Sequence, residues 1–193
     1  AGAHPRGITA GPGGALWFTQ PGVEAIGRIA TAGTVQTYPL PSGTTHPYDI
    51  TAGPDGAMWF TVEGGIGRIT RAGAITITPI PRAGATPTGI ASGDGALWYV
   101  DFAASILGRV SVDGAITEHA LAPGSGPAAL VVGGDGVWIS QQGAGSLVRV
   151  DAEGTTKVTV ALDDGAAPNG LALGGDGTVW AAAAGVDRVV ASR

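Results

Sequence analysis

The chain has 193 residues, of which 44% are hydrophobic and only 13% are charged, and its formal net charge is −5. The ten basic residues form no cationic cluster, which argues against nucleic acid and anionic membranes as partners, and no apolar run approaches the roughly 18 residues of a membrane helix. The absence of cysteine excludes disulfide bonds and thiolate metal sites.

The predicted elements of the first 46 residues form a short unit that the chain then repeats. Pro5 is followed by an apolar strand, "GITA", and by a turn at Gly13-Gly14, where glycine supplies the positive φ that a tight hairpin requires. A strand containing Trp17 and a strand containing Arg28 come next, and the Thr-rich strand "TVQTYPL" ends the unit. The first unit therefore predicts four antiparallel strands.

The same order of elements returns with a period of about 40 residues. The tryptophans are Trp17, Trp59, Trp98, Trp138 and Trp180. The arginines are Arg28, Arg68, Arg109, Arg149 and Arg188, and the opening prolines are Pro5, Pro47, Pro87, Pro127 and Pro168. Four units carry an Asp-Gly pair at the hairpin turn. Three residue types agree on one register, which predicts repeat units at 5–46, 47–86, 87–126, 127–167 and 168–193.

Four antiparallel strands in 40 residues are the content of one β-propeller blade. We therefore expect an all-β fold, a single domain over residues 1–193 that is a β-propeller of about five four-stranded antiparallel blades. The tryptophan of each unit would pack blade against blade. A solenoid fits less well, because solenoid coils are usually shorter and do not need a four-stranded meander.

The last blade is expected to be incomplete, because the sequence ends at Arg193 after the third predicted strand of that unit. Three arrangements follow. The ring closes with a three-stranded blade, the chain is part of a larger ring, or a second chain covers the open edge. The last arrangement would be self-association, since an unpaired strand edge invites partners.

The segment "PYDITAGPDGAMWFT", followed by "IGRIT" and "ITITPIP", resembles the streptogramin B lyase (virginiamycin B lyase) family. The resemblance covers the whole chain and is closest in the first three units. It implies a propeller of such blades, seven in that family. It also implies an activity, the opening of a cyclic depsipeptide antibiotic by elimination, with a histidine as general base and Mg²⁺ held near glutamates.

The resemblance places the histidine directly after the blade-opening proline, one glutamate directly before it, and another four residues after the tryptophan. The positions after the prolines hold no histidine: they are Arg6, Tyr48, Thr88, Ala128 and Asn169. The positions before the prolines hold no acid: they are His4, His46, Thr86, Gly126 and Ala167. Four residues after the tryptophans, only Glu63 matches. The catalytic set is incomplete.

The second unit nevertheless places His46, Tyr48, Asp49 and Glu63 where propeller geometry predicts one mouth of the channel. A histidine with a pKa near 6.5 exchanges protons at neutral pH, so His46, Tyr48 and Glu63 are the catalytic candidates. Glu63 is also the candidate Mg²⁺ ligand that the resemblance implies. In the structural alternative His46 caps a loop, Tyr48 lines the channel and Glu63 is solvated.

Ligand contacts are expected from residues that reach the same mouth. Asp101 follows "WYV", in the place where the Trp-Phe-Thr-Glu segment of the family ends with Thr-Glu, and we expect Asp101 to face this mouth. The candidate ligand-binding residues are Arg6, Tyr48, Asp49, Asp101 and Asn169. The arginine of each unit is expected to be structural, bridging carbonyls or an acid in the adjoining blade.

Two functions of different classes follow from the sequence. One is a propeller that binds a small or peptide-like ligand at the channel mouth without full lyase chemistry. The other is a magnesium-dependent carbon–oxygen lyase, or a hydrolase, that acts on a cyclic depsipeptide antibiotic and confers resistance. A scaffold within a larger assembly is a third possibility. The compartment stays open between the cytoplasm and secretion after processing.

Overall fold

The structure of the protein is a computed structural model that describes residues 2–185 and 188–192, with side chains up to residue 185. Apart from two short 3₁₀ turns, η1 (Pro12–Gly14) and η2 (Pro21–Val23), the regular elements of these residues are β-strands. Within this part of the chain no helix has the length and apolar character needed to cross a bilayer.

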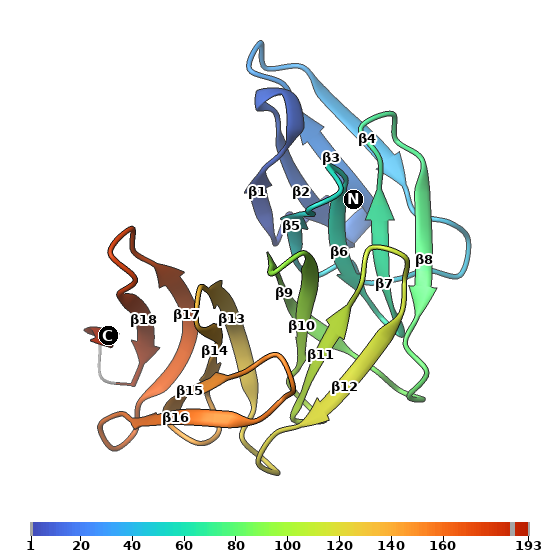
Figure 1. Ribbon diagram of the computed structural model, residues 1–193. Helices are drawn as coiled ribbons and strands as arrows, with labels where there is room; N and C mark the ends of the chain where they lie inside the picture. The colour runs from blue at the N-terminus through green and yellow to red at the C-terminus, as the bar shows by residue number, and fades with distance from the viewer. Residues whose placement is uncertain (1, 186–187, 193) are drawn as a thin grey trace.

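The strands form five antiparallel sheets, each a meander of consecutive strands (Figure 1). Blade 1 contains β1 (Ile8–Ala10), β2 (Leu16–Gln20), β3 (Ala25–Ile29) and β4 (Val35–Pro39). Blade 2 contains β5 (Ile50–Ala52), β6 (Met58–Val62), β7 (Gly65–Ile69) and β8 (Ile75–Pro79). Blade 3 contains β9 (Pro87–Gly93), β10 (Ala96–Asp101), β11 (Ile106–Val110) and β12 (Ile116–Ala120). Blade 4 contains β13 (Pro127–Gly133), β14 (Gly136–Gln141), β15 (Ser146–Val150) and β16 (Thr156–Ala161). Blade 5 contains β17 (Ala167–Leu173), β18 (Val179–Ala184) and β19 (Arg188–Ser192).

The five blades are arranged as an arc. The innermost strands β1, β5, β9, β13 and β17 contact one another in that order, and Figure 1 shows an opening between the first and fifth blades. The all-β propeller with an incomplete last blade is thus confirmed. Closure of the ring by a three-stranded blade is wrong for the described residues, because the fifth blade does not reach the first.

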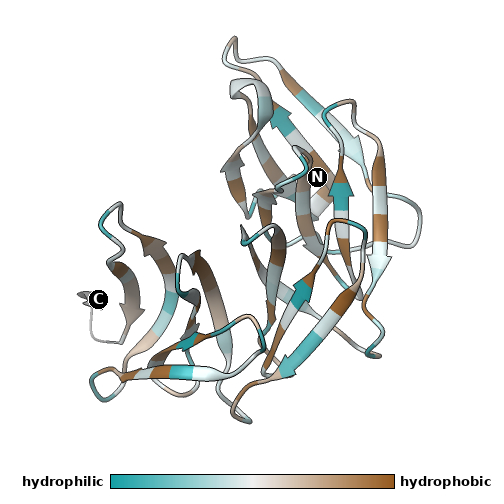
Figure 2. Cartoon of the chain, viewed as in Figure 1, coloured by the Kyte–Doolittle hydropathy of each residue, from teal (hydrophilic) through white to brown (hydrophobic). Residues whose placement is uncertain are grey.

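Neighbouring blades are held together by the repeated tryptophan. Trp17, for example, is fully buried, and it packs in one cluster with Ile50, Met58 and Phe60 of blade 2. Trp59, Trp98 and Trp138 are at most 5% exposed, and each shares a cluster with residues of the following blade. Figure 2 shows hydrophobic residues recurring along the strands of every blade. The indoles therefore act as the wedges that the repeat predicted.

The repeated arginine is structural, but its partner lies in its own blade. Arg68 is directly opposite Trp59 in the β6–β7 pair, with its guanidinium 5.9 Å from the indole centroid. The same pairing occurs in blades 1, 3 and 4. In blade 5 the residue opposite Trp180 is Ala191, so Arg188 is out of register with the series. The expected bridge to an adjoining blade is replaced by contacts within the blade, which are the cation–π contact and, for Arg68 and Arg149, an ion pair with Asp55 and Asp135.

The glycine before this arginine makes room for an aromatic ring. A Cβ placed on Gly67 would lie 2.2 Å from the ring of Phe60, the residue directly opposite on β6. Blades 1 and 3 repeat this with Phe18 over Gly27 and Tyr99 over Gly108. The glycine of the Ile-Gly-Arg motif therefore allows an aromatic ring of the neighbouring strand to pack directly against the backbone.

Candidate functional site

The candidate site is a cavity of about 580 Å³ that residues of all five blades line. Each blade begins near its opening proline with the innermost strand, so the residues directly after the five prolines converge. All five line the cavity: Arg6, Tyr48, Thr88, Ala128 and Asn169. The remaining lining residues are Thr86, Phe102, Ala103 and Gln142. The volume is in the range of small-molecule pockets, and aromatic, charged, hydroxyl and amide groups share its surface.

The structure brings Arg6 and Tyr48 into direct contact. The guanidinium of Arg6 lies 4.5 Å from the centroid of the Tyr48 ring, and Arg6 is exposed. No carboxylate of the described residues is within ion-pair distance of Arg6. A cation held on an aromatic face and left without an acid is suited to an anionic or carbonyl group of a ligand.

Thr19 fixes the position of Tyr48. Its buried hydroxyl accepts the Gly7 N–H at 2.9 Å and donates to the Tyr48 carbonyl at 2.9 Å. The Tyr48 N–H in turn donates to the Thr61 carbonyl at 3.0 Å. The backbone of blade 2 is therefore tied to blade 1 at the cavity. Sequence reasoning missed this role, although Trp-Phe-Thr recurs in the first two units.

Asp49 is not among the residues that line the cavity. Its Oδ1 accepts the Ile50 N–H at 2.9 Å, and its Oδ2 accepts the Ile90 N–H of blade 3 at 3.1 Å. Burial raises the pKa of Asp49, while the two amides and the charge of Arg6 oppose the shift. The structure thus uses Asp49 to join blades 2 and 3.

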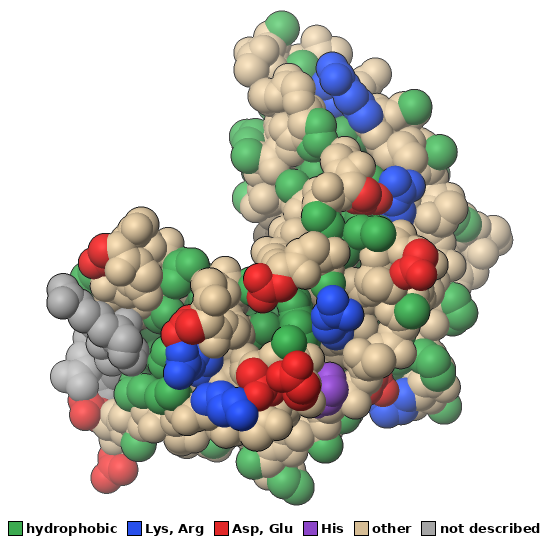
Figure 3. Space-filling model, in the orientation of Figure 1, with side chains coloured by type: hydrophobic (Ala, Val, Ile, Leu, Met, Phe, Trp, Pro, Cys, Tyr) green, Lys and Arg blue, Asp and Glu red, His purple; other side chains and the backbone are tan. Residues whose placement is uncertain are grey.

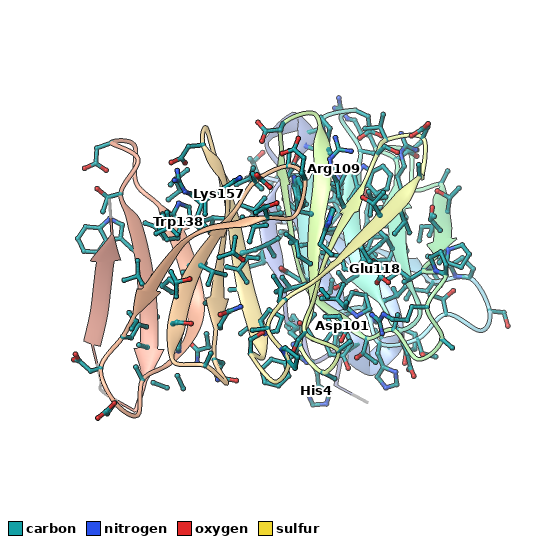
Figure 4. All side chains as sticks on the ribbon, turned by 60° about the horizontal axis from the view of Figure 1, so that its bottom comes forward. His4, Asp101, Arg109, Glu118, Trp138 and Lys157 are labelled. Carbon is teal, nitrogen blue, oxygen red and sulfur yellow. The ribbon has the colours of Figure 1, made fainter. Side chains whose placement is uncertain are left out.

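Asp101 lies at the same end of the blades as His4 (Figure 4), but its carboxylate is not on the cavity surface. The side chain is 1% exposed, and its Oδ2 accepts from Arg82 at 2.6 Å and from the Thr86 N–H at 2.8 Å. The expectation that Asp101 faces the mouth is therefore corrected. Phe102, the next residue, lines the cavity in its place.

Asp101 belongs to a network that no other described blade repeats. Arg82 also contacts Glu118 at 3.3 Å, and the Tyr99 hydroxyl donates to Glu118 at 2.9 Å. Burial alone would raise the pKa of Asp101, but the Arg82 guanidinium and the amides of Thr86 and Ala104 outweigh it and hold that pKa below its usual value. Burial and the adjacent Glu118 carboxylate raise the pKa of Tyr99. The network anchors the segment that enters blade 3.

His46 and Glu63 form a pair on the rim. His46 Nδ1 lies 3.1 Å from Glu63 Oε2, and both side chains are 55% exposed. The His46 backbone has a φ of 53° and donates its N–H to Glu24 Oε2 at 2.7 Å. Neither member of the pair is among the residues that line the cavity, whereas Tyr48 is. The structure therefore brings together two of the three catalytic candidates.

The residues around Glu63 do not fit a Mg²⁺ site. Its Oε2 already accepts the Thr45 hydroxyl at 3.1 Å and faces His46. Within the described part of the chain, no group of three His, Cys, Asp or Glu side chains is placed to hold a metal ion. Magnesium prefers several oxygen ligands in a near-octahedral arrangement, and one engaged carboxylate does not supply it.

Two sequence positions therefore predict the cavity. One is the residue after each proline, and the other is the fourth residue after the tryptophan, which gives Phe102 and Gln142. Thr88 and Ala128 stand at the first position and line the cavity, although the sequence analysis did not single them out. The position mattered more than the residue type.

Comparison with known proteins agrees with the propeller fold. The virginiamycin B lyase family matches residues 1–191. The chain belongs to this family. A streptogramin B lyase structure is 35% identical over 97% of the chain, with a TM-score of 0.90. A catalytically inactive virginiamycin B lyase from Staphylococcus aureus, solved with quinupristin, is 35% identical over 97% of the chain, with a TM-score of 0.89.

The match extends over only part of these relatives. This virginiamycin B lyase family member spans 64% of the first structure and 65% of the second. A putative gluconolactonase is 17% identical, and the match covers 95% of this chain and 72% of the gluconolactonase chain, with a TM-score of 0.72. At this identity the similarity shows a shared fold alone. The comparison with curated proteins finds no match.

Proposed function

We propose that this family member binds a small or peptide-like ligand in the cavity at the channel mouth, without full lyase chemistry. The supporting observation is that the residues after the opening prolines of all five blades line one space of about 580 Å³. Its guanidinium, hydroxyls and amides complement carbonyl groups, and its aromatic side chains complement rings. A cyclic depsipeptide such as quinupristin, which a relative was solved with, offers both.

The residue types at these positions support binding rather than proton abstraction. The family resemblance places the general base directly after the proline. Arginine, tyrosine, threonine, alanine and asparagine stand there in this chain. None of these side chains exchanges a proton readily near pH 7 in its ordinary state.

The test is calorimetric titration of the chain with quinupristin, together with chromatography of the ligand after incubation. Binding with an intact cyclic ligand is expected. Arg6→Ala should weaken binding roughly tenfold, because one charge-assisted hydrogen bond is lost. Arg71→Ala, in the turn after β7, is the matched control and should bind as the parent does. Absence of binding heat, or equal affinity in Arg6→Ala, would contradict the proposal.

One observation favours a second candidate, lyase or hydrolase activity and hence antibiotic resistance. The His46–Glu63 pair, 3.1 Å apart, is the arrangement of a base and the carboxylate that orients it. Chromatography would separate the intact cyclic ligand from a ring-opened product. A product of elimination has the same mass as the cyclic ligand, whereas a product of hydrolysis is heavier by one water. Ring opening that is lost in His46→Ala and kept in His119→Ala would support this candidate. An intact ligand after long incubation would exclude it for quinupristin.

A further inference from the structure

Blade 2 closes its first hairpin on a carboxylate. Asp55 Oδ1 accepts the Trp59 indole N–H at 3.0 Å and the Ala57 N–H at 3.2 Å. Asp55 Oδ2 accepts Arg68 Nε at 2.6 Å. Burial alone would raise the pKa of Asp55, but the hydrogen bonds from Trp59 and Arg68 outweigh it and lower that pKa. The three donors therefore surround a place that favours a negative charge.

Blade 1 has the same donors without the acid. Gly13 stands four residues before the tryptophan of this blade, where blade 2 has Asp55. Arg28 is directly opposite Trp17, with its guanidinium 5.7 Å from the indole centroid, and this distance is 5.9 Å in blade 2. A Cβ on Gly11 would lie 2.7 Å from Trp17 Nε1, and the equivalent Cβ in blade 2 would meet the same nitrogen of its own indole. The indole and the guanidinium are therefore placed alike in the two blades.

Both donors of blade 1 are buried and lack an acceptor. Trp17 is fully buried, and neither its Nε1 nor Arg28 Nε has a hydrogen-bond partner among the described residues. The Nη1 group of Arg28 donates to Gln36 at 3.1 Å. Met58 Sδ borders the indole at Gly11, but a thioether sulfur is a weak acceptor without charge, so it does not neutralise the guanidinium. Buried donors of this kind are destabilising until an acceptor reaches them.

A second guanidinium adds positive charge at the same place. Arg71, in the turn after β7, lies over Gly13, because a Cβ on Gly13 would be 2.9 Å from Arg71 Nη2. Arg71 is exposed, and like Arg28 it forms no ion pair within the described part of the chain. In Figure 3 the uppermost basic group, over blades 1 and 2, has no acidic side chain beside it. Unpaired guanidinium groups beside a free indole N–H suit a carboxylate.

Blade 3 differs from blade 1 although its indole is also free. Trp98 Nε1 has no acceptor among the residues that the structure describes. The turn of blade 3, however, carries the exposed carboxylate of Asp94, and a Cβ on Gly95 would have no atom within 4 Å. Blade 3 therefore combines a free indole with a negatively charged turn, and no group of a neighbouring blade covers Gly95.

We propose that the first hairpin of blade 1 binds a carboxylate, which takes the place of the Asp55 side chain of blade 2. The Trp17 indole and Arg28 Nε donate to this carboxylate, and Arg71 pairs with it from the solvent side. The ligand is a small carboxylate ion or the terminal carboxylate of a peptide. The site lies beyond the other end of β1 from Arg6 and shares no residue with the cavity at the channel mouth, so it does not rest on the proposed function.

The test is a titration of the ¹⁵N-labelled chain with sodium formate at constant ionic strength, observed at the tryptophan indole N–H signals. The Trp17 signal should shift and saturate, with half-saturation below about 0.1 M, an affinity that one charge-assisted hydrogen bond supplies. The Trp59 signal should stay in place because Asp55 already bonds this indole, and the Trp98 signal should stay because its turn is acidic. Equal shifts of the three signals, or a Trp17 signal that does not saturate, would overturn the proposal.

Two arginine substitutions test the charge at the site. Arg28→Gln should weaken formate binding at Trp17 at least about tenfold, because the charged donor is lost. Arg109→Gln is the matched control, since it removes the arginine that lies over Trp98, and it should leave the Trp17 titration unchanged. Equal weakening by the two substitutions would mean that formate does not bind at blade 1.

Three further measurements define the site. Asp55→Ala should make the Trp59 signal respond to formate, and a response there without one at Trp17 would overturn the proposal. A Trp17 response to N-acetylglycine as well as to formate would extend the site to peptide termini, and a response to formate alone would restrict it to small ions. Arg71→Ala should weaken formate binding and leave quinupristin binding unchanged, which separates this proposal from the proposed function.

Discussion

Replacing Asp101 with asparagine removes a buried carboxylate that Arg82 and two backbone amides hold in place. Arg82 Nη2 is 2.6 Å from Asp101 Oδ2, and the Thr86 and Ala104 amides donate at 2.8 and 3.0 Å. Breaking a buried ion pair by removing one partner costs about 3 kcal/mol of unfolding free energy. We expect that loss at pH 7, because the remaining contact of Arg82 with Glu118 is longer, at 3.3 Å.

The loss should depend on pH with a defined sign. The pKa of Asp101 is lowered in the folded state, so between its folded and unfolded pKa values the unfolded chain binds more protons. The carboxylate therefore stabilises the fold fully above its unfolded pKa of about 4, and this stabilisation is lost as the pH falls toward the folded pKa. The difference between the parent and Asp101→Asn should shrink in that acidic window.

Urea unfolding at pH 7 and at pH 3 measures both effects. Asp94→Asn is the matched control, because Asp94 is an exposed turn residue, and its cost should stay below about 0.5 kcal/mol at either pH. The reasoning would be refuted if Asp101→Asn cost no more than Asp94→Asn at pH 7. A difference that grows on acidification would refute the assigned sign.

Two further stability predictions concern the blade repeat, and urea unfolding measures both. Gly67→Ala should lower the free energy of unfolding by about 2 kcal/mol or more, because the new Cβ would lie 2.2 Å from the Phe60 ring. Gly134→Ala is the control and should be nearly neutral, because a Cβ there would have nothing within 4 Å. Equal effects of the two substitutions would contradict the contact between the Phe60 ring and the Gly67 backbone. Asp55→Ala should cost about 1–2 kcal/mol, because the Trp59 indole N–H at 3.0 Å, the Arg68 guanidinium at 2.6 Å and the Ala57 N–H at 3.2 Å lose their common acceptor. An unchanged midpoint would show that these contacts of Asp55 do not contribute to stability.

The blades could be predicted from the sequence because their determinants are local and repeated. Trp59 and Arg68 are nine residues apart and directly opposite in neighbouring strands, so the unit itself fixes the register. The Asp55-Gly56 turn between the first two strands is equally local, with Gly56 at a φ of 74°. Five copies of the pattern made the propeller and the convergence of the post-proline positions predictable.

The accessibility of individual carboxylates could not be predicted in the same way. Asp101 is buried because Arg82, 19 residues earlier and outside the repeated pattern, reaches it. Asp49 is engaged between blades because its carboxylate accepts the Ile90 amide of the next blade. Such contacts depend on the path of single linkers and on neighbouring blades. The opening of the ring depends likewise on how blades 1 and 5 lie relative to each other.

The central claim is that the residues after the opening prolines converge on one cavity, and a spin label tests it most directly. The chain has no cysteine, so Asn169→Cys carries a single nitroxide. The label should broaden the amide signals of Arg6, Tyr48, Thr88 and Ala128, and leave those of the outer-strand residues 36 and 76 sharp. Broadening confined to blades 4 and 5 would mean that the sheets form a linear stack, and it would contradict the account.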